Sequence, residues 1–186
     1  MDGVRAHVAI GGEVPGPVLA AATSVYRKAF AEAPYHEPPS SADRFADRVR
    51  RYFAEREGAR LAWVGDDAEV AAVALGVIGT PGTFWVDRVA AFLTEQAARE
   101  WIGSRCFEVV HVAVDPGHRR RGFGRMVLDL MTAGAPARTA LLGCDPNAPA
   151  ARGLYLNAGW QPIAEDFAAA PGDIPHWVMA KPLTGG

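Results

Sequence analysis

Residues 106–125 read CFEVVHVAVDPGHRRRGFGR. The first nine, Cys106 to Val114, are largely β-branched and apolar, which predicts a strand. Asp115-Pro116-Gly117 ends that strand, and a helix that ends near Gly134 follows the last glycines. The chain therefore runs through a strand, a loop and a helix. The loop is Arg119-Arg120-Arg121-Gly122-Phe123-Gly124-Arg125, called the arginine–glycine loop below.

The arginine–glycine loop has the chemistry of an anion site. Its glycines let the backbone approach a ligand closely, and the first N–H groups of the following helix have no partner inside the helix. Backbone donors from Arg120 to Arg125, the helix dipole and four arginine side chains together suit a pyrophosphate. A solvated turn before an amphipathic helix is the simpler alternative for such a cluster.

Two familiar phosphate sites do not fit the same residues. A P-loop needs a Lys-Ser/Thr pair after its last glycine, but Arg125-Met126 follows Gly124. The dinucleotide fingerprint needs a third glycine, and Met126 and Val127 occupy its place. ATP hydrolysis and NAD binding are therefore not expected.

Two motifs carry a resemblance to a known family. Residues 112–124 follow the pattern Val-x-Val-Asp-Pro-x-x-Arg-x-x-Gly-x-Gly, and residues 154–160 read Leu-Tyr-Leu-Asn-Ala-Gly-Trp. The first resembles the acetyl-CoA motif of the GNAT acetyltransferase superfamily, and the second is similar to the family's Leu-Tyr-x-x-x-Gly-Phe/Trp signature. The resemblance covers nearly the whole chain except residues 85–101, which we interpret as an inserted helical element.

The resemblance implies one domain over residues 1–186, with a mixed α/β fold. Its central sheet would be mostly antiparallel, splayed between the two central strands and flanked by helices. Hydrophobic periodicity and turn residues place the elements independently. Ser41 is expected to cap the second helix. Strands are predicted at 5–10, 60–64, 70–78, 106–114, 139–144, 160–167 and 177–180. Helices are predicted from 17 to about 30, from the Ser41 cap through 53, over about 85–101, from the arginine–glycine loop to near 134, and over 150–158.

The family resemblance also implies how acetyl-CoA would bind. Amides of Arg120, Arg121, Gly122, Phe123, Gly124 and Arg125, with Arg119 beside them, would hold the pyrophosphate. The pantetheine arm would run along Val112, Ala113 and Val114, where the family has a β-bulge. Val112 N–H would face the thioester carbonyl as an oxyanion donor, a type of contribution worth about 3 kcal/mol. Asn147 is a further cofactor candidate, although its spacing from Tyr155 is one residue longer than in the family, and its turn sequence needs no ligand to explain it.

Three groups are candidates for the proton transfers. Tyr155 matches the family tyrosine that reaches the CoA sulfur, and its phenol would protonate the departing thiolate. Glu108, eleven residues before Arg119, matches a glutamate that serves some members as general base; a water molecule or a purely structural carboxylate is the alternative. His111 is a weaker candidate for the base.

The acceptor is not identified by the sequence. The family builds its acceptor side largely from the early helices and their loop, so Tyr35, His36 and Glu37 are candidates, with residues 85–101 as another wall. We expect direct acetyl transfer to a primary amine without a covalent enzyme intermediate. The alternative is a non-catalytic acyl-CoA-binding or sensing module of the same fold.

Composition limits the remaining function classes. The 186 residues are 49% apolar and 22% charged, as in ordinary globular proteins, and the net charge of −2 offers no general attraction to nucleic acid or acidic membranes. Cys106 and Cys144 lie in apolar runs and are expected to be buried thiols. No metal site, leader or membrane-spanning run is evident, so a cytoplasmic protein is expected, and the oligomeric state stays open, a homodimer included.

Overall fold

The computed structural model describes residues 5–66 and 69–183. The strands are β1 (Ala6–Ile10), β2 (Arg60–Gly65), β3 (Val70–Gly79), β4 (Cys106–Val114), β5 (Thr139–Cys144), β6 (Gln161–Phe167) and β7 (His176–Pro182). The helices are α1 (Gly16–Ala31), α2 (Ser40–Glu55), α3 (Phe84–Phe92), α4 (Glu95–Trp101), the 3-10 turn η1 (Pro116–His118), α5 (Phe123–Thr132) and α6 (Pro149–Asn157).

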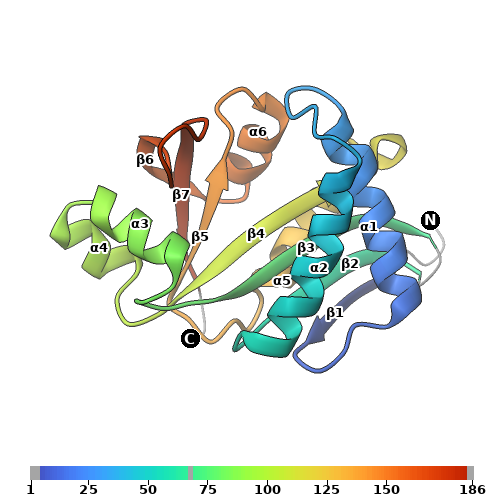
Figure 1. Ribbon diagram of the computed structural model, residues 1–186, viewed down its shortest axis with the longest axis horizontal. Coiled ribbons are helices and arrows are strands. Elements are labelled where there is room, and N and C mark those ends of the chain that lie inside the picture. The colour runs from blue at the N-terminus through green and yellow to red at the C-terminus, as the bar shows by residue number, and fades with distance from the viewer. Residues whose placement is uncertain (1–4, 67–68, 184–186) are drawn as a thin grey trace. The chain divides into compact units, whose positions relative to one another are not determined.

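These elements form a sheet of seven strands in the order β1-β2-β3-β4-β5-β7-β6 (Figure 1). The pairs β1·β2, β2·β3, β5·β7 and β6·β7 are antiparallel, and β4·β5 is parallel. The predicted fold class, a mostly antiparallel sheet with flanking helices, is confirmed. The chain divides into two compact units, residues 1–77 with 110–133 and residues 78–109 with 134–186, so β3 and β4 contribute to both.

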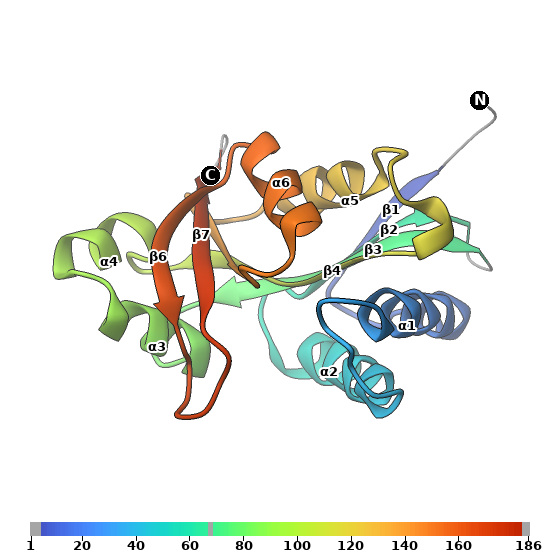
Figure 2. The same ribbon diagram turned by 90° about the horizontal axis from the view of Figure 1, so that it is seen from above.

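In the first unit, helices cover both faces of the sheet. Figure 2 shows α1 and α2 on one face of β1, β2 and β3, and α5 on the other. Apolar residues at helical spacing turn one side of α1 and of α2 towards the strands, and the buried contacts continue to the end of β4. The largest members of this core are Leu19, Tyr26, Phe45, Leu61, Trp63 and Leu75.

A buried arginine fixes the end of α5. Arg60, on β2, is only 5% exposed, and its Nη1 donates to the carbonyl oxygens of Ala133 at 2.7 Å and Met131 at 3.4 Å. These carbonyls end the helix and have no partner further along it. A cation there is also favoured by the helix dipole, so Arg60 anchors the helix whose opposite end carries the arginine–glycine loop.

In the second unit, α3 contacts β6, and α4 contacts β5. Their buried side chains, Val86 and Val89 on α3 and Ile102 after α4, pack with Leu141, Phe167 and Val178 of the strands. Cys106 and Cys144 are both buried free thiols, as expected.

Two local predictions were wrong. Residues 85–101 are not one helix: α3 ends at Phe92, and α4 begins after Thr94, whose hydroxyl accepts from the Ala97 N–H at 3.3 Å and caps a new helix. Ser41 is not the N-cap of α2, because the helix begins one residue earlier, and Ser41 is buried inside it, where its hydroxyl accepts from Arg44.

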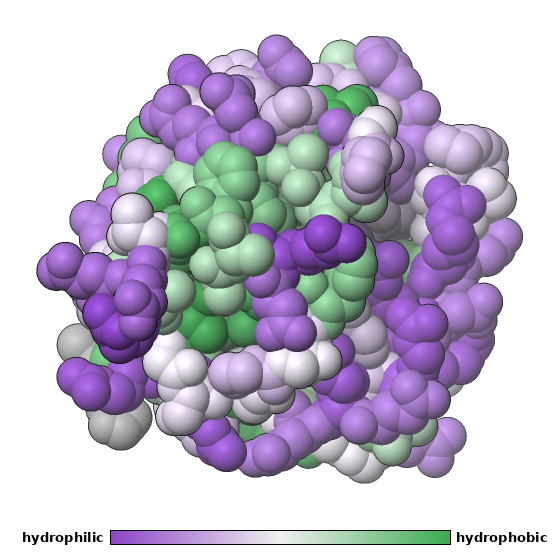
Figure 3. All heavy atoms as spheres, turned by 60° about the vertical axis from the view of Figure 1, so that its left-hand side comes forward, coloured by the Kyte–Doolittle hydropathy of each residue, from purple (hydrophilic) through white to green (hydrophobic). Residues whose placement is uncertain are grey.

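The paired helices leave apolar side chains at the surface. Phe84 is 63% exposed and Phe92 is 50% exposed. Figure 3, which brings α3 and α4 forward, shows apolar side chains gathered on this face of the molecule.

The last strand in the sheet order, β6, is irregular. Its pairing with β7 shifts register between Pro162 and Ala164 and again between Ala164 and Phe167. Asp166 has a positive φ of 56°, a left-handed conformation that breaks the regular pleat.

Candidate active site

The arginine–glycine loop joins β4 and η1 to α5, and two of its residues have a left-handed backbone conformation. Arg120 has a φ of 64° and Gly122 a φ of 83°, both left-handed. Gly122 is the N-cap of α5, and no side chain caps the helix start. A Cβ added at Gly122 would meet no atom within 4 Å, so the space beside the loop is open. The left-handed residues turn the chain sharply into α5, whose first N–H groups lack a side-chain cap and are donors that suit an anion.

Two of the four arginines of the loop are engaged by carboxylates. Arg119 Nη1 lies 2.5 Å from Glu32 Oε2 at the end of α1, and Arg125 Nε lies 2.6 Å from Asp129 Oδ2 one turn along α5. Among the described residues, Arg120 and Arg121 make no ion pair with a carboxylate, and both are exposed. The loop therefore presents two uncompensated positive charges beside the open end of α5.

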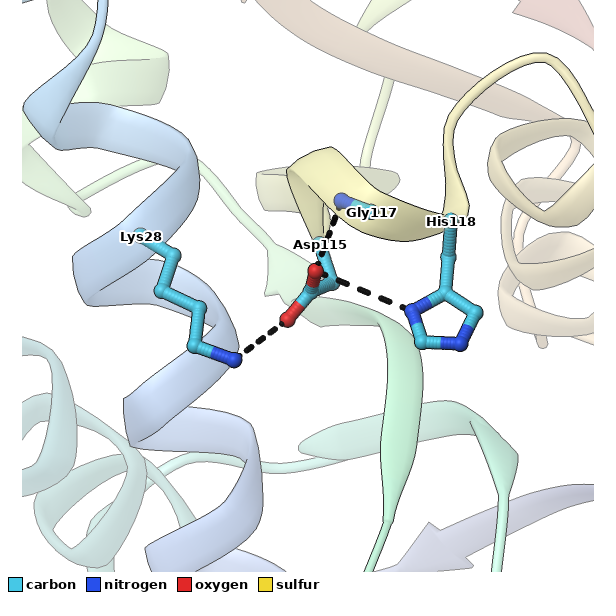
Figure 4. Close-up of polar contacts among 4 residues, drawn as sticks. All are labelled: Lys28, Asp115, Gly117 and His118. Atoms are coloured by element: carbon cyan, nitrogen blue, oxygen red, sulfur yellow. Dashed lines mark hydrogen bonds and ion pairs between the residues drawn. The ribbon is translucent and has the colours of Figure 1, made fainter.

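Asp115 ties the start of this region to the rest of the first unit (Figure 4). Its carboxylate accepts from Lys28 Nζ at 2.7 Å and from the Gly117 N–H at 2.9 Å, and it lies 3.7 Å from His118 Nδ1. Its own N–H donates to the carbonyl of Ala71 on β3 at 2.9 Å. The hydrogen bond from Lys28 lowers the pKa of the Asp115 carboxyl, although burial acts in the opposite direction. Asp115 thus stays ionised and holds η1 against α1 and β3.

The last three residues of β4 directly precede Asp115. Ala113 is buried in the core formed with α1 and α2, whereas Val112 and Val114 are partly exposed. The predicted contacts of Val112, Ala113 and Val114 with a pantetheine arm, and the bulge, remain predictions.

His111 on β4 meets an aromatic and charged cluster from α1 and α2. Its ring lies edge-on to Tyr26 at 5.2 Å and near Phe45 at 5.7 Å. Its Nε2 is 2.6 Å from Nη1 of Arg48. Burial, followed by the charge of Arg48, lowers the pKa of His111 to about 3, so the ring is neutral near pH 7 and is too weak a base to deprotonate an ammonium group.

The three residues predicted on the acceptor side follow α1. Tyr35 is partly exposed and its ring lies 4.6 Å from that of Phe30, while His36 is exposed. Glu37 accepts a hydrogen bond from the Tyr26 hydroxyl at 2.9 Å. The structure therefore brings Glu37 and Tyr35 to the same aromatic group that surrounds His111, and leaves His36 outside these contacts.

The remaining predicted residues belong to the second unit. Glu108 is buried at 9% exposure, and its charge, after burial, helps to raise the pKa of Cys106 to about 12. Tyr155 is 7% exposed, and its ring lies 6.2 Å from that of Trp160. Asn147 is exposed, and its backbone N–H donates to Asp145 Oδ1 at 2.7 Å, the turn geometry that its sequence favours.

Four residues in these contacts were not predicted from the sequence: Tyr26, Lys28, Glu32 and Arg48. Lys28, on α1, and Glu32, just after it, are four residues apart. Asp115 and Arg119 are also four residues apart, with the acidic residue first instead of the basic one. This equal spacing could have indicated the two ion pairs, but the residues of each pair are 87 positions apart in the sequence. Nothing local singles out Arg48.

Comparison with known proteins decides the family. Residues 22–160 match the family described as acetyltransferase (GNAT) family. The chain belongs to the GNAT acetyltransferase family. The predicted family is thus confirmed over most of the chain. A comparison with curated proteins gives no match to this chain.

Solved structures share the GNAT fold at low sequence identity. A proposed GNAT acetyltransferase from Desulfovibrio desulfuricans superposes with a TM-score of 0.67 at 15% identity, over 96% of this chain and 99% of that chain. The ribosomal-protein-S18-alanine N-acetyltransferase of Escherichia coli gives 0.61 at 17% identity, over 98% and 96%. YncA, a proposed acetyltransferase of Salmonella typhimurium determined with acetyl-CoA, gives 0.64 at 16% identity, over 97% and 95%.

In residues 5–66 and 69–183, no helix is long and apolar enough to cross a membrane. Over the same residues, no group of three or more His, Cys, Asp or Glu side chains is arranged to hold a metal ion.

Proposed function

We propose that this GNAT protein transfers the acetyl group of acetyl-CoA directly to a primary amine. The observation that carries the proposal is the arginine–glycine loop, where the start of α5 has no side-chain cap and the space beside Gly122 is open. Arg120 and Arg121 are exposed there and make no ion pair with a carboxylate among the described residues. Helix amides and guanidinium groups are the donors that suit a pyrophosphate. The relative from Salmonella typhimurium, determined with acetyl-CoA, supports the choice of cofactor.

The reaction needs one bond to form and one to break. The neutral amine nitrogen attacks the thioester carbonyl carbon, and the carbonyl oxygen gains negative charge in a tetrahedral intermediate. The C–S bond then breaks, and the amide and CoA thiolate form. The amine loses a proton to a base, and the thiolate gains one from an acid, so protons balance and no covalent enzyme intermediate is needed.

The roles of individual side chains rest on the family motifs. Val112 N–H stabilises the oxyanion, Tyr155 protonates the thiolate, and Glu108 or a water molecule accepts the proton of the amine. The pantetheine arm follows Val112, Ala113 and Val114, with Asn147 as a further contact.

A ligand panel tests the cofactor. Acetyl-CoA, CoA, ATP, NAD and an oligonucleotide are compared for their effect on thermal unfolding, because a ligand that binds only the folded state raises its stability. We expect acetyl-CoA and CoA to raise Tm and the others to leave it unchanged. Stabilisation by the oligonucleotide with a steep salt dependence would instead point to nucleic-acid binding through the arginines.

Release of CoA in the presence of amine libraries tests transfer itself. Turnover of an amine supports the acetyltransferase, whereas tight acetyl-CoA binding with no turnover of any amine indicates the non-catalytic binding module. For Glu108→Gln, activity that is lost near pH 7 and recovers at high pH supports the base role. An unaltered pH profile in that variant assigns deprotonation to water.

Replacement of the proposed acid gives a sharper prediction. Tyr155→Phe keeps the ring but removes the proton, so kcat should fall by about 10²-fold or more while acetyl-CoA affinity changes little. Initial rates and calorimetric titration measure the two quantities. Tyr52→Phe, on α2, is the control and should behave as the unaltered protein; an equal kcat in both variants would remove Tyr155 from the mechanism.

A further inference from the structure

Two arginines on α2 have no carboxylate partner among the described residues. Arg44 and Arg48 lie four residues apart and therefore on one side of the helix. Among the described residues neither contacts a carboxylate, whereas Arg50, on the same helix, pairs with Asp47, and Arg119 pairs with Glu32. Like charges at this spacing repel. A bound anion would relieve this repulsion.

The contact between Arg48 and His111 does not supply that anion. A guanidinium only donates, so Nε2 of His111 accepts from Arg48 at 2.6 Å and the neutral ring keeps its proton on Nδ1. A neutral ring orients the guanidinium without cancelling its charge. His111 directly precedes Val112, the residue proposed to face the thioester, so Arg48 is bound to the strand residue next to it in the sequence.

An opposite charge contacts the same aromatic cluster. Glu37 accepts from the Tyr26 hydroxyl, and Tyr26 in turn stacks on Phe45 at 4.6 Å and meets the His111 ring edge-on. After burial, the charge of Glu37 raises the pKa of Tyr26, whereas the charges of Arg48 and Arg44 act to lower it. One phenol therefore lies within reach of one carboxylate and two guanidinium groups.

From this arrangement we infer the class of acceptor: an amine that carries a carboxylate of its own, as an amino acid does. Arg48, with Arg44 beside it, holds the carboxylate, and Glu37 receives the ammonium group. The rings of Phe30 and Tyr35, in contact at 4.6 Å, border the Glu37 side and favour a cation through their faces. The inference rests on the proposed acetyl transfer to an amine, and it names Arg48 as the residue that decides specificity.

The first experiment compares matched acceptors. The twenty amino acids are screened for CoA release, and each active one is compared with its amide and with the amine that lacks the carboxylate. Loss of a charge-assisted hydrogen bond to the carboxylate should lower kcat/KM by about tenfold or more in both analogues. Equal or faster turnover of the amines without a carboxylate would overturn the inference and leave acetyl transfer intact.

The second experiment changes the protein. Arg48→Gln should lower kcat/KM for the amino acid by about tenfold or more and leave the rate with its amide unaltered, whereas Arg48→Lys should lie between. Glu37→Gln should lower the rate with all primary amines alike. Arg50→Gln, whose arginine already pairs with Asp47, is the matched control and should alter neither rate.

Binding provides a readout that does not need turnover. Titration of the CoA complex with the amino acid should show weaker binding in Arg48→Gln and not in Arg50→Gln. Acetyl-CoA affinity that matches the unaltered protein shows that each variant is folded. If acetyl-CoA binds and the amino acid binds equally to both variants, Arg48 is not its site; if acetyl-CoA itself does not bind, the proposed function fails instead.

Discussion

At the scale of single residues, charges that lie far apart in the sequence organise the first unit. Lys28 meets Asp115, Glu32 meets Arg119, and Arg48 meets His111. The first two contacts link α1 to the loop that follows β4, and the third links α2 to β4 itself. Each of them therefore holds a residue of the proposed site against one of the two early helices.

His111 should make the fold sensitive to acid. Its folded pKa of about 3 lies below its ordinary value of 6.5, so as pH falls below 6.5 the unfolded chain takes up a proton that the folded protein does not. Stability is unaffected above pH 7 and falls as the pH is lowered. Between pH 7 and pH 5 the loss should be about 2 kcal/mol.

Urea unfolding of the unaltered protein and of His111→Gln at pH 7 and pH 5 measures this loss. The glutamine keeps a neutral acceptor for Arg48 but does not titrate, so it should lose about 2 kcal/mol less between the two pH values. An identical pH dependence in the two proteins would show that His111 protonates in the folded state.

Glu32 should compete with the cofactor for Arg119. Its carboxylate lies 2.5 Å from the guanidinium that is predicted to assist the pyrophosphate. Exposed ion pairs contribute about 0.2–1 kcal/mol, so Glu32→Gln should tighten acetyl-CoA binding by a factor of about 1.4 to five. Calorimetric titration measures the affinity, with Glu95→Gln, which removes the partner of Arg99 on α4, as the control. Weaker binding in Glu32→Gln would mean that the pair positions the loop.

At the scale of elements, α5 is held at one end and open at the other. Arg60 occupies the carbonyl end from within the core, while the amide end remains free for a ligand. The helix can therefore present its donors without needing a ligand for its own stability.

Loss of the Arg60 cap should destabilise the fold. Arg60→Met leaves the carbonyls of Met131 and Ala133 without their buried donor, which should lower the free energy of unfolding by about 2–3 kcal/mol. Chemical denaturation followed by circular dichroism measures the change. Arg51→Met, on the exposed side of α2, should alter stability by less than about 0.5 kcal/mol. Equal stability of the two variants would contradict the capping role.

Most elements could be predicted from the sequence because their signals are local. Short apolar runs and flanking turn residues locate β4 and β5, and helical spacing locates α1 and α2. The break at Thr94 was missed because residues on both sides continue an apolar pattern, so only the capping hydroxyl marks it. Pro39 shifted the start of α2 to Ser40, since proline is tolerated ahead of a helix's first turn.

The site was only partly predictable. The glycines and arginines of the loop are adjacent in the sequence, and their chemistry could be interpreted directly. Arg48 and His111 are 63 positions apart in the sequence. Tyr26 and Glu37 are in contact because the loop after α1 brings Glu37 back to the Tyr26 hydroxyl. Such contacts depend on how helices pack on the sheet, which periodicity does not specify.

At the scale of the whole molecule, two strands belong to both compact units. The division falls between Val77 and Ile78 on β3 and between Val109 and Val110 on β4. Unfolding of either unit therefore removes part of a strand from the other. We expect one cooperative transition rather than two.

Two probes test this expectation. Trp63 lies in the first unit, and the other four tryptophans of the chain lie in the second. In Trp63→Phe the fluorescence reports the second unit alone, whereas far-UV circular dichroism reports both. Coincident midpoints in urea support a single transition, and a separate fluorescence midpoint would show that the units unfold independently.

The irregular β6 strand has a consequence for concentrated solutions of the protein. A regular strand at the end of a sheet is a template on which another chain can add, and repeated addition leads to amyloid-like fibres. Pro162 withholds one amide, Asp166 interrupts the pleat, and the exposed neighbours Glu165 and Asp166 place two negative charges side by side. Growth of the sheet by strand addition is thereby blocked at this end.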